Sequence, residues 1–215
     1  RSAVAALWDG SRAAQANAVR LFSGTAFEEV FAELALAPDF EARKAAPGAE
    51  ILYVHRRDGD ADFYFVANQQ SRPESFEALF RVAGKAPELW DPATGAVTRP
   101  GLFRIEKDGR TALPMRLDPN GSTFVVFREP APARHAVALE FTDSAPSASS
   151  VPVPAVELER GADGKLFARV SKNVSCTVAF SDKTAATHGP LRPKLPAPVT
   201  LDGPWQVVFP PNLGA

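Results

Sequence analysis

The segment ILYVHRRDGDADFYFVAN, residues 51–68, has the pattern of a β-hairpin. Its two arms, Ile51–Arg56 and Asp62–Asn68, are rich in the β-branched and aromatic side chains that favour strands. Between them, Asp58-Gly59-Asp60 supplies an acidic, glycine-containing turn. The segment FRVAGKAPELWDPATG, residues 80–95, continues with short extended runs that end in a Pro-Gly turn. We therefore expect antiparallel pairing that grows outward from this hairpin.

Short strand candidates recur along the rest of the chain. They cover residues 77–82, 88–90, 96–98, 102–107, 111–117, 123–128, 155–159, 165–171, 175–180, 199–201 and 205–209, with turns at 92–95, 108–109, 119–121 and 163–164. Strands this short and turns this frequent favour an antiparallel β-sandwich over βαβ units. Ser122–Phe127 is apolar almost throughout, which predicts a central strand buried on both faces.

One helix is predicted before the first strands, over Ala26–Leu36. Thr25 and Glu28 have the spacing of a capping box. An apolar stripe follows at helical spacing and consists of Phe27, Val30, Phe31 and Leu34. Pro38 stops the helix. The fold class we expect is mainly β: an antiparallel β-sandwich with one N-terminal helix and a second, smaller β-sandwich-like module.

The chain divides at DSAPSASSVPVP, residues 143–154, whose small polar residues and prolines suit a linker. We expect residues 1–142 to form the helix and the sandwich, and residues 155–215 to form the second small β module. That module reads as incomplete at its C-terminal end, where LDGPWQVVFPPNLGA resembles a strand just begun. Together with a start at Arg1 without methionine, this ending suggests a piece of a longer polypeptide.

Composition excludes several classes of function. The 24 Lys and Arg residues nearly cancel the 25 Asp and Glu residues, so no basic stripe for nucleic acid and no polybasic membrane surface is expected. No apolar run approaches the roughly 18–20 residues that a membrane span requires. Cys176 is alone in the probable strand SCTVAF, where a buried inert thiol is favoured over a reactive one.

Two tryptophans and one arginine are the candidate carbohydrate-binding residues. Trp90 and Trp205 could each stack on a sugar ring, although a tryptophan beside a turn in a strand more often fills the core. Arg56 could hold a sugar hydroxyl or a carboxylate. The competing interpretation of His55-Arg56-Arg57 is an interdomain ion-pair cluster with the acidic hairpin tip.

No catalytic residue and no metal ligand is predicted in this chain. Glu88 and Asp91 are close, but spacing alone does not make the carboxylate pair that glycoside hydrolysis requires. Read from Asp58 as a calcium loop, the sequence would place Phe63 where glycine is needed and Gln69 where glutamate is needed. A solvated hairpin tip is the favoured interpretation of these aspartates.

Several blocks resemble the region that follows the catalytic barrel in bacterial glycoside hydrolases of family 106, the α-L-rhamnosidases. The most specific one is HRR…GDADFYFVANQQ…FRVAGKAPELWDPATG, within residues 55–95. The others are FSGTAFEEVFAELALAPDF (22–40), GSTFVVFR (121–128), ADGK (162–165) and LDGPWQVVF (201–209).

The resemblance implies a parent enzyme that hydrolyses terminal α-L-rhamnosyl linkages, using carboxylates of an (α/β)-barrel together with Ca²⁺. Those carboxylates and any Ca²⁺ would lie outside this chain, which needs no cofactor of its own. Its implied partners are the catalytic barrel and rhamnose-containing glycans, and its implied location is the periplasm or the medium. Two alternatives stay open: a stand-alone carbohydrate-binding module and a purely structural spacer.

Overall fold

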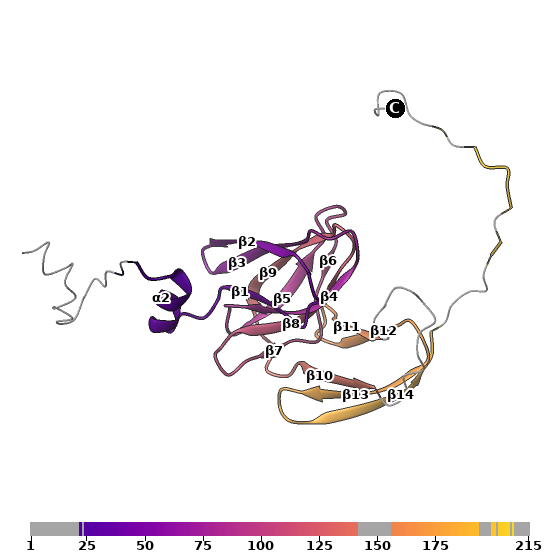
Figure 1. Cartoon of the computed structure of the whole chain (residues 1–215). Helices are drawn as coiled ribbons and strands as arrows, with labels where there is room; N and C mark the ends of the chain where they lie inside the picture. The colour runs from indigo at the N-terminus through magenta and orange to yellow at the C-terminus, as the bar shows by residue number, and fades with distance from the viewer. Residues whose placement is uncertain are drawn as a thin grey trace, which may run out of the picture.

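The computed structural model describes residues 22, 24–141, 156–193, 199–200, 202–206 and 208. Over these residues the chain forms one helix and fourteen strands (Figure 1). The helix is α2 (Phe27–Glu33), and the strands are β1 (Phe40–Arg43), β2 (Ile51–Asp58), β3 (Ala61–Asn68), β4 (Glu74–Phe80), β5 (Lys85–Trp90), β6 (Val97–Thr98), β7 (Arg104–Ile105), β8 (Thr111–Leu117), β9 (Ser122–Pro130), β10 (Ala136–Phe141), β11 (Val156–Arg160), β12 (Leu166–Val170), β13 (Val174–Phe180) and β14 (Ala185–Leu191). The predicted fold class, mainly β with one helix, is confirmed.

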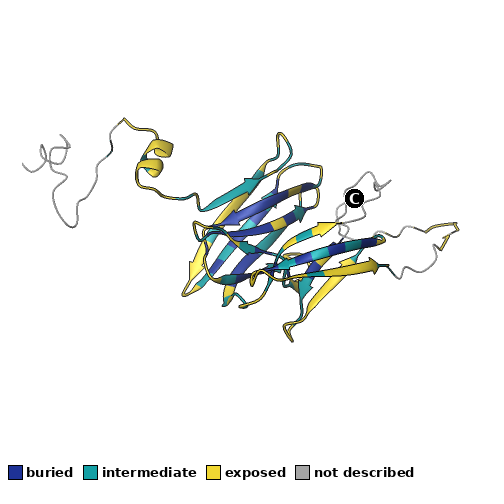
Figure 2. Cartoon of the chain, turned by 90° about the horizontal axis from the view of Figure 1, so that it is seen from below, coloured by how far each residue is buried: buried dark blue, intermediate teal, exposed yellow. Residues whose placement is uncertain are grey.

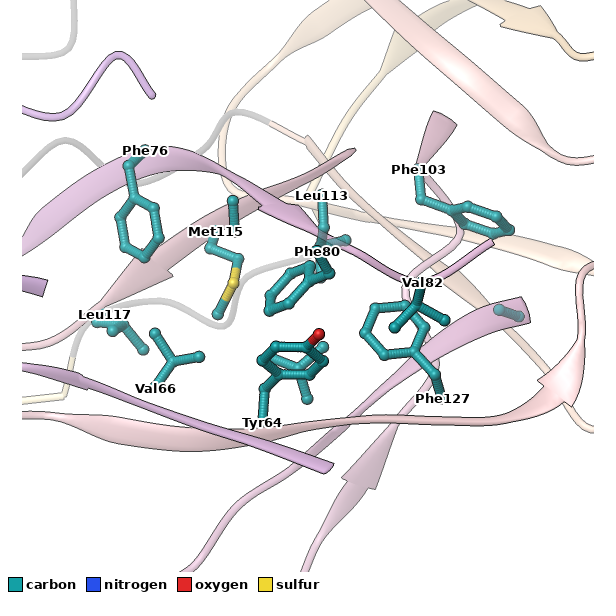
Figure 3. Close-up of a cluster of buried hydrophobic side chains, with 13 residues drawn as sticks. Tyr64, Val66, Phe76, Phe80, Val82, Phe103, Leu113, Met115, Leu117 and Phe127 are labelled. Carbon is teal, nitrogen blue, oxygen red and sulfur yellow. The ribbon is translucent and has the colours of Figure 1, made fainter. Parts of the chain in front are cut away.

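Two antiparallel sheets pack face to face as a β-sandwich. In the described residues one sheet has the order β1-β4-β8-β7 and the other the order β2-β3-β9-β5-β6. The core between them is aromatic and aliphatic (Figure 3), and includes Tyr64, Val66, Phe76, Phe80, Leu113, Met115 and Phe127. β9 is the central strand of the five-stranded sheet, which confirms the prediction that residues 122–127 form a central strand.

Strand alternation explains which side chains enter this core. Along β3 the exposure pattern alternates strictly, so Tyr64 and Val66 are fully buried while their neighbours on the strand are only partly covered. The ring of Tyr64 meets Phe80 edge-on at 4.9 Å, and Phe80 meets Phe127 at 5.3 Å. Contacts of this kind between aromatic rings add about 1 kcal/mol each to the burial of their area. The sandwich is therefore stabilised from within by rings supplied by three strands.

A second, smaller core lies beside the sandwich. It is built by the sheet β10-β13-β14 and the hairpin β11-β12, and contains Val156, Leu158, Val174, Val178 and Phe180. Backbone hydrogen bonds join this unit to the sandwich: Gly101 N donates to Leu158 O at 2.7 Å, and Phe103 N donates to Ala136 O at 3.1 Å. The two units therefore share an interface made partly of main-chain groups.

The predicted linker, residues 143–154, lies outside the described residues, so the division of the chain stays a prediction. Strand β10, which precedes that segment, pairs with β13, which follows it, through contacts such as Leu139 opposite Val178. The second β unit consequently takes β10 from before the predicted linker and β11 to β14 from after it.

Helix α2 is shorter than predicted and begins differently. Its N-cap is Ala26, with no side-chain hydrogen bond, so the predicted capping box of Thr25 and Glu28 is wrong. The apolar stripe is present, but Phe27 is 74% and Phe31 is 50% exposed. The helix lies apart from the sandwich and is exposed along most of its length (Figure 2). In the described part of the chain, no helix has the length and apolar character of a membrane crossing.

Several strand predictions were incomplete. β1, β10 and β14 were missed. The strand predicted over residues 102–107 is reduced to Arg104–Ile105. The strands predicted over 199–201 and 205–209 are absent from the residues described there. β1 and β10 are short strands held by pairing with distant partners, which local propensity does not report.

Candidate functional site

The outer face of the five-stranded sheet is unusually apolar. The register pairs Val54 with Phe65, Phe65 with Phe124, Phe124 with Trp90 and Trp90 with Val97. Paired residues project to the same side of a sheet, so these side chains form one surface that crosses all five strands. We call it the aromatic face; it comprises Leu52, Val54, Arg56, Phe63, Phe65, Trp90, Val97 and Phe124.

Ring contacts order the centre of the aromatic face. Phe63 meets Trp90 edge-on at 6.1 Å, and Phe65 packs against Phe124 at 4.9 Å. The guanidinium of Arg128 lies over the Trp90 ring, 5.4 Å from its centroid. One side of the indole is therefore occupied by a cation that a sugar ring would have to displace.

Glu88 lies beneath these rings and is fully buried. Its Oε2 accepts hydrogen bonds from Trp90 Nε1 and from Arg128 Nε, both at 3.0 Å, and its Oε1 lies 3.3 Å from Arg99 Nη2. Burial by itself would raise the pKa of Glu88, but the bonds from Arg128 and Trp90 and the two arginine charges outweigh it and lower that pKa. Glu88 is consequently an ionised anchor and is unsuited to the role of a general acid.

Asp91 directly follows β5, and its side chain accepts hydrogen bonds from the backbone of the next turn. Its Oδ1 accepts hydrogen bonds from the backbone N–H groups of Ala93 at 2.7 Å and Thr94 at 3.1 Å. These bonds lower the pKa of the Asp91 carboxyl. With Glu88 ion-paired and Asp91 occupied by the turn, the two carboxylates do not form a catalytic pair.

A second polar cluster lies at the β2–β3 edge of the sandwich. His55 Nδ1 lies 3.0 Å from Asp39 Oδ2, and His55 Nε2 lies 3.1 Å from Asp62 Oδ1. The imidazole stacks on the Tyr64 ring at 4.0 Å. Lys85 contacts the other oxygen of Asp62 at 3.1 Å, which helps to balance the charge. These contacts form a hydrogen-bonded network within the sandwich.

The neighbouring arginines do not join this network. Arg56 Nη1 donates to the carbonyl of His55 at 3.0 Å, and Arg57 Nε donates to the carbonyl of Gly59 at 3.2 Å. Because alternate residues face opposite sides, Arg56 lies on the aromatic face and His55 on the other side of β2. The structure therefore brings two predicted carbohydrate-binding residues, Arg56 and Trp90, onto one surface.

Trp205 does not belong to that surface. It is 70% exposed and lies in a described stretch without strands, so the interpretation of Trp205 as a core residue is wrong. Cys176, in contrast, is 1% exposed, and burial raises the pKa of its thiol. That environment matches the inert cysteine expected from the sequence.

The described residues do not fit the Ca²⁺ that the resemblance implies for a parent enzyme. Within them, no group of three or more His, Cys, Asp and Glu side chains is arranged to hold a metal ion. At the hairpin, Asp62 is already bound by His55 and Lys85. No step of a reaction can therefore be assigned to a metal held by this part of the chain.

A groove of ≈ 570 Å³ lies between the sandwich and the β11–β12 hairpin. Its charged side chains pair with one another: Arg116 with Asp118 at 2.8 Å, and Arg169 with Glu159 at 2.8 Å. This pairing reduces what the groove offers to the hydroxyl groups of a sugar. The aromatic face is therefore the stronger candidate for a functional surface.

Sequence reasoning missed most members of this surface. Phe63, Phe65 and Phe124 were counted only as strand formers, and Arg99 and Arg128 were not singled out. A signal was present in FYFV of β3 and TFVVF of β9, whose unbroken apolar runs are typical of strands covered on both sides. Only the register shows that their second faces form one continuous surface.

Comparisons with known proteins find similarity to parts of larger glycoside hydrolases. A family model described as alpha-L-rhamnosidase, of glycoside hydrolase family 106, matches residues 1–103. Among solved structures, the rhamnosidase from Novosphingobium sp. PP1Y is similar, with 39% sequence identity and a TM-score of 0.54. That similarity covers 64% of this chain and 14% of the rhamnosidase.

A curated relative carries a different activity name. A protein of Formosa agariphila named "Putative beta-glucuronidase" is 35% identical over 80 residues, which is 37% of this chain. The match spans only 7% of that protein, so both relatives are far longer than the part that this chain resembles. The family model and the solved structure agree with each other and with the sequence blocks quoted above. Residues 1–103, just under half of this chain, are therefore similar to glycoside hydrolase family 106, whose model is described as alpha-L-rhamnosidase.

Proposed function

We propose that this chain is the non-catalytic β-sandwich portion of a larger glycoside hydrolase that removes terminal α-L-rhamnosyl residues. The observation that carries the proposal is the 39% identity to a rhamnosidase over 64% of this chain but only 14% of that enzyme. The role of the sandwich in this proposal is mechanical: it braces the catalytic barrel and positions neighbouring modules.

The states of the carboxylates support a non-catalytic role. A glycosidase needs two free carboxyl groups, one of which carries a proton at working pH. Glu88 has its pKa lowered within an arginine pair, and Asp91 has its pKa lowered by backbone donors. Both shifts run opposite to the raised pKa of a general acid. The carboxylates that act on the sugar then belong to the rest of the enzyme, as does any Ca²⁺.

Glycan binding is the second candidate, because Trp90 and Arg56 share the aromatic face. Two observations weigh against it. The indole N–H of Trp90 is already donated to Glu88, and Arg128 covers one side of its ring. Apart from Arg56, the exposed members of the face are the aliphatic Leu52, Val54 and Val97, which offer no hydrogen bonds to sugar hydroxyls. A brace therefore accounts for this surface better than a sugar platform does.

The test compares the complete native polypeptide with residues 1–215 alone. We expect the complete polypeptide to hydrolyse p-nitrophenyl α-L-rhamnopyranoside and the 215-residue chain to be inactive. Glu88→Gln and Asp91→Asn in the complete polypeptide should leave kcat unchanged. Hydrolysis by the 215-residue chain would contradict the non-catalytic role. A preference for p-nitrophenyl β-D-glucuronide would instead assign the enzyme to the activity named in the Formosa relative.

We also propose a periplasmic or secreted location for the complete enzyme, an expectation taken from the family resemblance. Fractionation of the source bacterium, with antibody against residues 1–215, tests it. Signal in the periplasm or medium supports the proposal, and signal confined to the cytoplasm rejects it.

A further inference from the structure

Two strands of the five-stranded sheet, β3 and β9, are apolar on both faces, although the structure packs a second sheet on only one of them. β3 and β9 read as strands buried on both faces. On the inner side this is true, since Tyr64, Val125 and Phe127 are fully buried. On the outer side, Val126 is also fully buried, but Phe63, Phe65 and Phe124 are only partly buried. The sequence of these strands is therefore typical of a sheet whose outer face is also covered by other protein atoms.

The edges of the same face show the mismatch most clearly. Leu52 is 59% exposed, Val54 is 48% exposed and Val97 is 45% exposed. These residues lie on β2 and β6, the two outermost strands of the sheet, so the apolar surface runs from one edge to the other. Scattered apolar residues on a surface need no explanation, but a continuous patch of this kind marks an interface.

We infer that the aromatic face is the surface on which another domain of the same parent polypeptide packs. This inference rests on the proposed function, because it requires a larger enzyme around the chain. The partner surface has an apolar centre opposite Phe65 and Phe124. It has a carboxylate at the rim opposite Arg56, which is exposed at the β2 edge.

The size of the face favours a domain of the same polypeptide over a second copy of the chain. The five strands have 8, 8, 9, 6 and 2 residues, and at about 3.3 Å per residue and about 4.8 Å between strands they present roughly 500 Å². A contact of that size buries roughly 1,000 Å² in total, which lies within the range for domains of one polypeptide and below that of a stable dimer. The relatives contain enough additional polypeptide to provide such a domain. The matches cover 14% of the Novosphingobium enzyme and 7% of the Formosa protein, so 86% and 93% of these proteins lie outside the matches.

The experiment measures maleimide labelling of introduced cysteines in the complete native polypeptide. Val54→Cys and Val97→Cys place small thiols at the two edges of the aromatic face, where the substituted side chains are exposed. Lys107→Cys, in an exposed turn outside that face, is the matched control. Cys176 is buried and contributes little background. Labelling is quantified by mass spectrometry on the peptide that carries each new cysteine.

We expect Val54→Cys and Val97→Cys to react at least about tenfold more slowly than Lys107→Cys, because a packed interface must open before the reagent enters. In residues 1–215 alone, all three should react at similar rates. Equal rates in the complete polypeptide would overturn the inference. So would rates that are equal until a rhamnose-containing oligosaccharide is added, a result that would make the face a glycan platform.

The outcomes separate the inference from the proposed function. The same preparation is assayed for rhamnoside hydrolysis. Hydrolysis with a freely labelled face overturns the inference alone. Protection without hydrolysis overturns the proposed activity and leaves the docking surface standing. A native polypeptide with a mass of only 23.0 kDa would overturn both.

Discussion

The outer faces of the two sheets of the sandwich differ in how far their apolar side chains are shielded from solvent. On the four-stranded sheet the outer face is charged: Arg104 Nη2 donates to Glu77 Oε1 at 2.6 Å, and Arg110 Nη1 donates to Glu41 Oε2 at 3.0 Å. We call this surface the charged face. Beneath its ion pairs Leu79 is fully buried. The aromatic face, in contrast, leaves Leu52 and Val54 about half exposed.

The difference shows on which face this chain covers its own apolar atoms. Long arginine side chains shield apolar atoms with their stems while their charged groups stay near water. The charged face uses this property, and it is also approached by the second β unit, whose Ala138 and Leu139 line a small cavity with Arg104. The aromatic face has one comparable device, the pairing of Glu88 with Arg99 and Arg128. The remainder of that face depends on a partner.

The largest effect is expected from the core that both faces share. Phe127→Ala removes a fully buried ring that contacts Tyr64 and Phe80. We expect the free energy of unfolding to fall by about 3–5 kcal/mol. Urea denaturation of the 215-residue chain measures it. Phe65→Ala on the aromatic face is the control and should cost clearly less. Equal losses would mean that the aromatic face is already a core in this chain.

A slightly smaller effect is expected from breaking the charged face. Arg104→Ala leaves the carboxylate of Glu77, whose side chain is 10% exposed, without its 2.6 Å partner. The Arg104 side chain is 35% exposed and Lys44 Nζ stays 3.6 Å from Glu77, so we expect a loss of about 2 kcal/mol. Arg104→Lys keeps the positive charge and should recover part of that loss. Denaturation of both variants tests this, and an unchanged stability for Arg104→Ala would show that the pair contributes nothing.

Acid pH should destabilise both faces, through Glu77 on the charged face and Glu88 beside the aromatic face. We expect this loss of stability to be smaller than the loss caused by either substitution. Burial raises the pKa values of Glu77 and Glu88, but their arginine bonds outweigh it, and both pKa values end below the ordinary 4.5. A carboxylate with a lowered pKa stabilises the fold fully above its unfolded value. That stability is lost as the pH falls from 4.5 through the folded pKa.

Thermal denaturation between pH 7 and pH 3 checks this dependence. Glu88→Gln removes the contribution of Glu88 and should flatten the acid side of the profile of Tm against pH. A profile as steep as that of the unsubstituted chain would mean that Glu88 does not carry a lowered pKa.

The smallest effect is expected at the edge of the aromatic face. Val54→Lys places a charge at a position that is 48% exposed, so the stability of the 215-residue chain should change by no more than about 0.5 kcal/mol. Val54→Thr is the neutral control. A loss several times larger in this chain would mean that Val54 is already buried, and the contrast between the two faces would be lost.

Local patterns were sufficient for the hairpin and the class of fold. The β-branched and aromatic content and the turn chemistry of residues 51–68 predicted a hairpin, and β2 and β3 pair over Ile51–Asp58 and Ala61–Asn68. The apolar run of residues 122–127 correctly marked the central strand. These features depend on residues that are close along the chain, and their residue types form patterns that can be recognised in the sequence.

The candidate surface could not be predicted in the same way. Trp90 was favoured as a core residue, yet its pairing with Phe124 turns it to the outer face, and a shift of one residue would have reversed that. Glu88 carried no sign of burial, because its partner Arg128 is 40 residues away. The contacts of Asp39 with His55 span 16 residues, and no spacing rule connects them.

The sequence was therefore enough to establish an antiparallel β-sandwich, its central strand and the resemblance to glycoside hydrolase family 106. Those properties follow from strand-forming residues, turn residues and the sequence blocks quoted above, all of which are local. The tertiary structure decided that one outer face is closed by ion pairs and that the other is a continuous apolar surface. That decision depends on the register between β3, β9 and β5, because register alone determines which side of a sheet each residue occupies.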